Sequence, residues 1–202
     1  MTARPDSAAM QTSDSGSGLA KAIQLGQSLD ERDFIILNQA DFLSNHLAGA
    51  WAVSDYHNAL KLGYDVEHLR WPEWVERCVA AGALPRVLSP GQVFASVEPQ
   101  MAQRYGLAAD CQICAGTTDA NAAFIATQAS RLGDAVTSLG STLVLKQISV
   151  KPVNDSRLGV YSHRLGQRWL VGGASNSGGA VIAAHFSPAE IRYLTTQLKP
   201  AI

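Results

Sequence analysis

The segment ICAGTTDANAAFIA, residues 113–126, carries one carboxylate, Asp119, between an apolar run and an alanine-rich stretch. A carboxylate beside an apolar interior is costly unless hydrogen bonds, a metal ion or a ligand offset its lost hydration. The residues alone leave two roles open for it. Asp119 either caps a helix that starts near Asn121, a common role for Asp after a turn, or faces a cleft and takes part in chemistry.

Three glycine-rich turns follow apolar runs, at residues 116–119, 140–142 and 172–175. Glycine permits close approach of the backbone, and backbone N–H groups beside Ser or Thr hydroxyls suit phosphate groups. None of the turns matches the Walker-type or dinucleotide-binding glycine patterns. Each turn alone predicts an ordinary turn or close helix–strand packing, whereas the three together favour a phosphate-binding site.

The elements that must position these residues are clearest after Cys111, where apolar runs alternate with glycine. Two of the runs join at a tight Gly-Ser turn and predict a β-hairpin. The mixture of strands and helices favours α/β layers. A structural histidine, His163, is expected on the strand 160–165. The other expected elements are a buried strand at 111–116, a helix at 119–130, the hairpin at 134–140 and 141–149, a third sheet strand at 168–174 and a helix at 175–186.

The first half of the chain is predicted to be mainly helical. Apolar spacing, proline at helix starts and glycine at helix ends mark its elements. Residues 1–18 are small and polar and predict a flexible lead. The expected helices lie at 19–29, at 31–49 with Gly49 as its stop, at 71–82 between Pro72 and Gly82, and at 97–107, with a connector of mixed character at 53–65.

Composition limits the classes of partner. The 202 residues are 47% hydrophobic and 16% charged, so a sizeable core is expected and global disorder is excluded. A formal net charge of −1 gives no electrostatic case for nucleic acid or an anionic membrane. No apolar run is long enough to span a bilayer, and the N-terminus lacks the order of a signal peptide, so a cytoplasmic location is expected.

Two groups of residues resemble metal sites. Cys111 and Cys114 form a C-x-x-C pattern, but no second pair of Cys or His is near, and two buried thiols in a reducing cytosol are the favoured account. Asp55, His57, Asn58 and Asp65 are clustered with mixed spacing, which favours a structured connector over a metal site. No metal ligand is assigned.

Three motifs occur in order along the chain: AGTTDANAAFIA at 115–126, GDAVTSLGSTLVLK at 133–146 and RWLVGGASNSGGAV at 168–181. This series resembles the central part of the FGGY carbohydrate kinases, and within them most of all the xylulokinase and D-ribulokinase group. The resemblance covers roughly residues 30–190. It implies an actin-like (ribonuclease-H-like) ATPase fold with two domains, a sugar deep in the cleft between them and MgATP across that cleft.

The resemblance also implies roles for single residues. Asp119 matches the general base that acts on the attacking sugar hydroxyl, and Thr118 with Asp119 would contact the substrate. The turn formed by Gly140, Ser141 and Thr142 matches the second phosphate-binding element, and Gly173 matches a nucleotide-contacting glycine. ATP and Mg²⁺ are the implied cofactors, and a sugar and a nucleotide are the implied small-molecule partners.

The chain departs from the family pattern at both ends. It has no strand with the D-x-G-T loop that opens the family, and SDSGSG at 13–18 is not counted as one. The later adenosine-binding glycine segment is also absent. An internal piece of a kinase is therefore expected, with a lead at 1–18, the latter part of the first actin-like domain at 19–130 and the start of the second at 131–202.

The predicted function is ATP-dependent phosphorylation of a ketopentose of the D-ribulose or D-xylulose class, with little or no activity in this chain alone. The alternatives are a non-catalytic remnant or binding module with the same fold, and an actin-like or chaperone-like ATPase. An incomplete sheet would expose strand edges and apolar surface, so a dimer or a need for missing segments is also expected.

Overall fold

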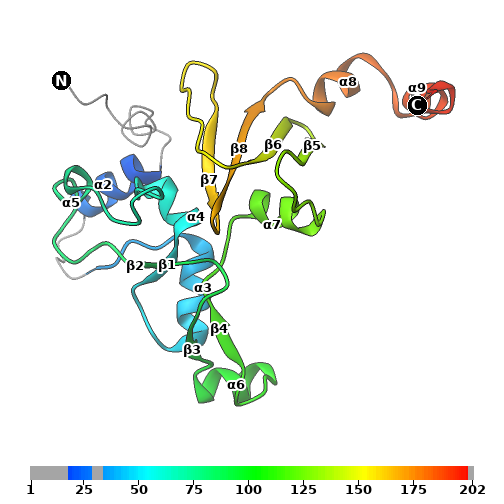
Figure 1. The fold of residues 1–202 in the computed structure, drawn as a ribbon. Helices are drawn as coiled ribbons and strands as arrows, with labels where there is room; N and C mark the ends of the chain where they lie inside the picture. Colours follow the sequence, from blue (N-terminus) through cyan, green and yellow to red (C-terminus); the bar gives the residue numbers. More distant parts are fainter. Residues whose placement is uncertain (1–17, 29–33, 200–202) are drawn as a thin grey trace, which may run out of the picture.

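The computed structural model describes residues 18–28 and 34–199, and Figure 1 shows them as two groups of elements. The first region, residues 18–28 and 34–115, combines helices with two small sheets. The second region, residues 135–199, is built on a four-stranded sheet, and one helix lies between the two regions in the sequence. The lead expected at 1–18 lies outside the described residues apart from Gly18, which begins a helix.

Short elements make up the first region. The strands pair as β1 with β2, parallel, and β3 with β4, antiparallel. Its elements are α2 (Gly18–Ser28), α3 (Gln39–Ala48), β1 (Val53–Asp55), α4 (Tyr56–Ala59), the 3-10 helix η1 (Leu60–Leu62), α5 (Glu73–Glu76), β2 (Arg86–Leu88), β3 (Val93–Ser96), α6 (Pro99–Tyr105) and β4 (Gln112–Cys114).

The expected helices at 19–29 and 97–107 are confirmed as α2 and α6. The helix expected at 31–49 is wrong over residues 34–38, which are not helical. There Asn38 forms a capping box with Asp41, so α3 begins only at Gln39. Its end is as expected, because Gly49 adopts a left-handed φ of 60°.

The helix expected at 71–82 is also too long. Pro72 precedes α5 as predicted, but the helix ends at Glu76, well before Gly82. The Ala83 N–H instead bonds to Ala80 O, and the Ala83 carbonyl accepts the Ile36 N–H. These contacts turn the chain early and attach it to the segment before α3.

The stretch 53–65, predicted as a connector, contains β1, α4 and η1 and is largely buried. Asp55 starts α4 by accepting the backbone N–H groups of His57 and Asn58. The strands β1, β2 and β3 were not predicted, because three or four residues are too few to show an alternating pattern.

The second region confirms most of the expected elements. The hairpin and the strand at 168–174 are present, but the strand around His163 makes the sheet four-stranded rather than three-stranded, in the antiparallel order β5-β6-β8-β7. The last helix was not predicted. The elements from 119 onward are α7 (Asp119–Ala126), β5 (Ala135–Leu139), β6 (Leu143–Ser149), β7 (Tyr161–Leu165), β8 (Arg168–Ser175), α8 (Gly179–His185) and α9 (Pro188–Gln197).

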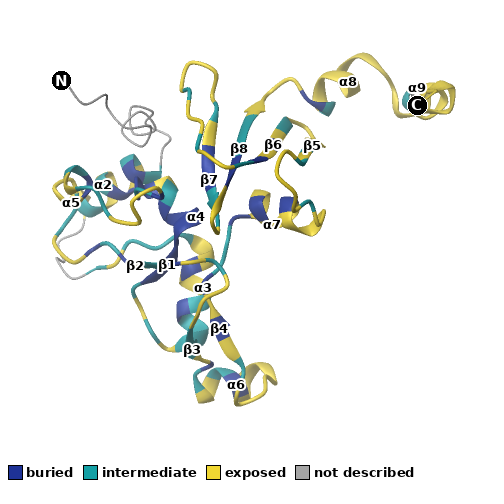
Figure 2. Ribbon diagram, in the orientation of Figure 1, coloured by how far each residue is buried: buried dark blue, intermediate teal, exposed yellow. Residues whose placement is uncertain are grey.

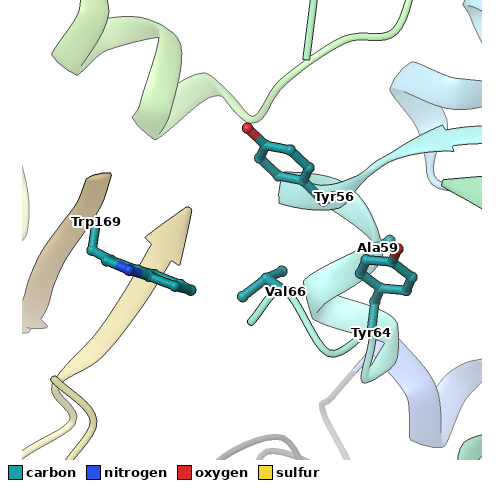
Figure 3. Packing of buried hydrophobic residues seen from close by; sticks show 5 residues of the cluster. All are labelled: Tyr56, Ala59, Tyr64, Val66 and Trp169. Carbon is teal, nitrogen blue, oxygen red and sulfur yellow. The ribbon is translucent and has the colours of Figure 1, made fainter. Parts of the chain in front are cut away.

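The two faces of this sheet pack against different parts of the chain. Trp169 and Leu170 are neighbours on β8, so their side chains point to opposite faces. Trp169 belongs to one hydrophobic cluster with Tyr56, Ala59, Tyr64 and Val66 of the first region, and Figure 3 shows its ring pointing toward Val66.

Leu170 lies on the other face, in a cluster with Phe124 of α7 and Ile148 of β6. Burial is accordingly concentrated where α4, α7 and the strands β6 to β8 meet, whereas α8 and α9 are almost entirely exposed (Figure 2).

The cysteine prediction is wrong. Cys78 and Cys114 are exposed and Cys111 is half-buried, because only Ile113 of β4 points into the core. Among residues 18–28 and 34–199, no three or more His, Cys, Asp or Glu side chains group into a metal site. No helix in that part of the chain is both long and apolar enough to cross a membrane.

Candidate functional site

Asp119 is the first residue of α7, directly after the loop that follows β4. The capping role is wrong for it, because Thr118 occupies the N-cap position and makes no side-chain cap bond. The Asp119 side chain is exposed, and its Oδ1 accepts the Ala120 N–H at 2.7 Å. Of the two roles that the residues left open, the one in which Asp119 faces open space agrees with this geometry.

A cavity of about 270 Å³ lies between α7 and the β5–β6 hairpin. Asp119 and Lys146 are the two charged residues in its lining, and they do not form an ion pair with each other. The remaining walls are mostly apolar. The lining consists of Asp119, Ala120, Ala123 and Phe124 of α7, Val136 and Ser138 of β5, and Val144 and Lys146 of β6.

Lys146 was not identified from the sequence. It is 8% exposed, and its Nζ donates a hydrogen bond to Oδ1 of Asn121. Burial lowers the pKa of the Lys146 ammonium to about 8, against the opposing effect of the Asp119 charge. The sequence offered one signal for this residue, a single lysine within the largely apolar strand LVLKQIS. Charged side chains are seldom buried without a partner, so a lysine in such a strand is a candidate functional residue.

Two buried polar atoms near Asp119 have no hydrogen-bond partner in the described part of the chain: Thr118 Oγ1 and Asn121 Nδ2. Leaving such a group unpaired costs about 1–3 kcal/mol. Thr118 is the N-cap residue of α7, and Asn121 lies in the first turn of the helix with Asp119. Thr118, predicted to contact substrate, therefore has a hydroxyl free to accept or donate a bond.

The predicted phosphate-binding turn is the tip of the β5–β6 hairpin. The Gly140 N–H bonds to the Thr142 carbonyl at 3.0 Å, and Ser141 and Thr142 are exposed. The start of α8 packs on this turn, because the Gly179 N–H bonds to Gly140 O at 2.7 Å. The turn forms the tip of the β5–β6 hairpin, and Asp119 lies at the start of α7, the helix that lines the cavity together with this hairpin.

Gly173 lies elsewhere on the sheet. It pairs with Leu145, whereas its neighbour Gly172 pairs with Lys146. Because successive positions of a strand alternate between faces, Gly173 belongs to the face opposite the cavity. A Cβ atom at Gly173 would lie 3.3 Å from Gly159 O, so the nearest chain on that face is the loop before β7.

A second polar cluster joins the loop before Asp119 to the sheet. His57 of α4 is 2% exposed and uses both ring nitrogens: Nε2 lies 2.5 Å from Arg164 O and Nδ1 lies 2.7 Å from Thr117 Oγ1. A carbonyl only accepts, so the Nε2–H donates and the Thr117 hydroxyl donates to Nδ1. Burial lowers the pKa of His57 and favours this neutral ring.

Further contacts hold the two regions together around His57. The fully buried Asp55 accepts bonds from His57 N, Asn58 N and Asn58 Nδ2. Arg164 donates from Nη1 to the carbonyls of Val66 and Glu67. Asp65, predicted as part of this group, lies apart from it and pairs with His68. The group is thus a structured junction, as the sequence favoured.

No protein-family model matches the chain. Its sequence is 24% identical to the gluconokinase of Bacillus subtilis over 150 residues, which are 71% of this chain and 29% of that protein. The structure is similar to xylulose kinase from Rhodospirillum rubrum, with a TM-score of 0.75 and 19% identity over 90% of this chain and 40% of that one.

The structure is also similar to gluconate kinase from Lactobacillus acidophilus, with a TM-score of 0.73 and 18% identity over 87% of this chain and 38% of that one. The chain spans less than a third of the length of the curated relative and about two fifths of these solved kinases. The expected resemblance to the FGGY-type sugar kinases and the expected actin-like fold are confirmed over the part that the chain covers.

Proposed function

We propose that this chain carries the general base and part of the nucleotide site of an ATP-dependent carbohydrate kinase. The observation that supports it most is the position of Asp119, exposed at the start of α7 and lining a cavity. The similarity to kinases of xylulose and gluconate supports the same reaction class. We assign residues 19–130 to the first actin-like domain and 131–202 to the second.

In the proposed reaction a substrate hydroxyl oxygen attacks the γ-phosphorus of ATP and ADP leaves. Asp119 accepts the hydroxyl proton, which is the role that a carboxylate at the acceptor side plays in phosphoryl transfer. The hydroxyl of Thr118, unpaired in the structure, contacts the substrate. The turn at Gly140, Ser141 and Thr142, together with Gly173, contacts the nucleotide.

ATP supplies the phosphoryl group, and Mg²⁺ neutralises part of its charge when bound. The described residues form no acidic cluster for the ion. Mg²⁺ is expected to arrive bound to the phosphates of ATP, because in kinase sites it keeps several waters and few protein ligands.

The acceptor is proposed to be a ketopentose of the xylulose or ribulose class, with gluconate as the rival. The motif resemblance favours the ketopentose, whereas the curated relative reported above is a gluconokinase. Both are polyhydroxylated carbon chains, but gluconate has one more carbon and carries a carboxylate, whereas the ketopentoses carry a ketone.

The test is ADP release from MgATP by the full chain with D-xylulose, D-ribulose and D-gluconate in turn. We expect slow, sugar-dependent release that falls at least about 100-fold in Asp119→Asn, because a positioned general base contributes that much or more. Binding of MgADP should be unchanged in the same variant. A chain that binds no MgADP and releases no ADP with any of the three would be a remnant or binding module, and the proposal would be wrong.

A further inference from the structure

Lys146 belongs to a row of paired residues that crosses the sheet on the side of α7. The register places Val136 of β5 opposite Lys146, Lys146 opposite Gly172 of β8, and Gly172 opposite Tyr161 of β7. Directly paired residues share a face of the sheet. A Cβ atom on Gly172 would lie 2.4 Å from Leu145 O and 3.0 Å from Lys146 Cγ, so glycine is what leaves room for the lysine stem.

The hydrogen-bonding capacity of Lys146 is only partly used. An ammonium carries three N–H donors, and the Asn121 carbonyl oxygen accepts one of them. No second acceptor for Nζ occurs among the described residues, and the Asn121 amide nitrogen is itself without a partner. Lys146, which lines the cavity, therefore holds donors in reserve, and Asn121, which is fully buried and does not line the cavity, leaves its amide nitrogen unpaired.

A purely structural role does not account for a lysine at this position. A charged side chain that is 8% exposed loses most of its favourable hydration, and this loss is costly. An apolar side chain of similar length could be buried there without that cost. The charged and titratable groups around it are Asp119 from α7, His163 from β7 and His57 from α4. Both histidines are neutral near pH 7, which leaves Asp119 as the anion among these groups. Its carboxylate forms no ion pair with the Lys146 ammonium.

We propose that the cavity between α7 and the β5–β6 hairpin binds an oxyanion, a phosphoryl group or a carboxylate, against Lys146 Nζ. A volume of about 270 Å³ suits such a group with a short hydroxylated carbon chain and is below the usual range for larger ligands. The proposal deepens the proposed function, on which it rests for the presence of a substrate next to Asp119. Lys146 would bring the oxyanion and the base into one cavity.

The test is calorimetric titration of the full chain at pH 7 with inorganic phosphate, D-gluconate and neutral D-xylulose. We expect at least one of the two anions to bind. Lys146→Met should weaken that binding at least tenfold, whereas Lys146→Arg, which keeps the charge, should stay within about threefold of the wild type. The matched control is Lys151→Met, which removes an exposed lysine just beyond β6 and should change nothing.

The two anions distinguish the source of the oxyanion. Binding of phosphate alone assigns Lys146 to the transferred phosphoryl group. Binding of gluconate alone assigns it to the carboxylate of a sugar acid, and would favour gluconate over the ketopentose as acceptor. The proposal is overturned if neither anion binds, or if Lys146→Met binds both as tightly as the wild type does.

A readout of stability separates binding from folding. Lys146→Met removes a buried charge but also the hydrogen bond to Asn121 Oδ1, so the two effects oppose each other and its unfolding midpoint should stay close to that of the wild type while anion binding is lost. Asp119→Asn should lose phosphoryl transfer yet keep anion binding. Suppose that phosphoryl transfer depends on Asp119 but that Lys146→Met does not change anion binding. This result refutes the inference about Lys146 and leaves the proposed function standing. Anion binding that depends on Lys146, with neither phosphoryl transfer nor MgADP binding, contradicts only the proposed reaction.

Discussion

Two buried polar clusters lie on either side of one short loop, and they differ in how completely their hydrogen bonds are made. The junction cluster is formed by Asp55, His57, Asn58 and Thr117, in which Asp55 accepts three bonds and both nitrogens of His57 are paired. The cavity cluster is formed by Thr118, Asn121 and Lys146, in which two buried atoms lack a partner.

The difference separates polar groups that fix the fold from polar groups whose hydrogen-bonding capacity is unused. Buried polar groups in folded proteins nearly always have partners, and each exception needs an explanation. In the junction cluster the partners come from α4, β7 and the loop before α7, so the cluster fixes how these parts meet. In the cavity cluster the two unpaired atoms belong to Thr118 and Asn121, one and two positions from Asp119, and Lys146 is the member that lines the cavity.

The largest effect on stability is expected at Asp55, which is fully buried. Asp55→Ala leaves three donors without an acceptor and should lower the free energy of unfolding by about 3 kcal/mol or more. Urea denaturation followed by circular dichroism measures it. A loss below about 1 kcal/mol would mean that the junction cluster does not stabilise the fold. The contrast between the junction cluster and the cavity cluster would then be wrong for the junction cluster.

An intermediate effect is expected from pH, through His163. Burial lowers the pKa of His163 to about 3, and the charges of Lys146, His57 and Lys61 act in the same direction. The folded state thus holds the neutral ring, whereas the unfolded chain takes up a proton near pH 6.5. The stability that His163 contributes is complete above pH 6.5 and is lost as the pH falls toward 3.

The free energy of unfolding should therefore drop by about 2 kcal/mol between pH 6.5 and pH 5 on account of His163, at up to about 1.4 kcal/mol per pH unit. His163→Phe should remove that part of the slope. Asp41 acts in the opposite sense, because burial raises the pKa of its carboxyl group. Denaturation curves of the wild type and His163→Phe at pH 7.5, 6.5 and 5 test this. If the free energy of unfolding changes with pH by the same amount in both proteins, the prediction is contradicted.

The smallest effects come from a matched pair of neighbours. Thr117→Val removes the hydroxyl that donates to His57 and should cost about 1 kcal/mol of stability. Thr118→Val removes a buried hydroxyl that has no partner and should raise the free energy of unfolding by about 1 kcal/mol. Under the proposed function only the second substitution should weaken substrate binding directly. Equal losses of stability would erase the distinction between the two clusters.

Much of the second region, and the helix α7 that precedes it, was predictable from the sequence. The β5–β6 hairpin, β8 and α7 each contain enough alternating or helical pattern, with glycine at the boundaries, to be recognised. Asp119 was also singled out, because it is an isolated carboxylate at the end of an apolar run. Its exposure on a cavity agrees with the role that the motif resemblance implies.

What the sequence did not reveal depends on contacts between distant residues. His57 bonds to Thr117, 60 residues away, and to Arg164, 107 residues away, and no local pattern encodes either pairing. Lys146 looked like an ordinary strand residue until α7 covered it. The short strands β1 to β3 form because partner segments meet in the fold, not because of their own propensity.

The ring of His57 also works as a rigid spacer. One imidazole sets the separation between the Thr117 hydroxyl and the Arg164 carbonyl, and an aromatic ring neither stretches nor bends. If β7 swings away from α4, either one of these two bonds breaks or the Thr117 segment moves with the strand. Asp119 lies two residues beyond Thr117, so a movement of β7 that kept both bonds would also displace the segment that carries the Asp119 carboxylate.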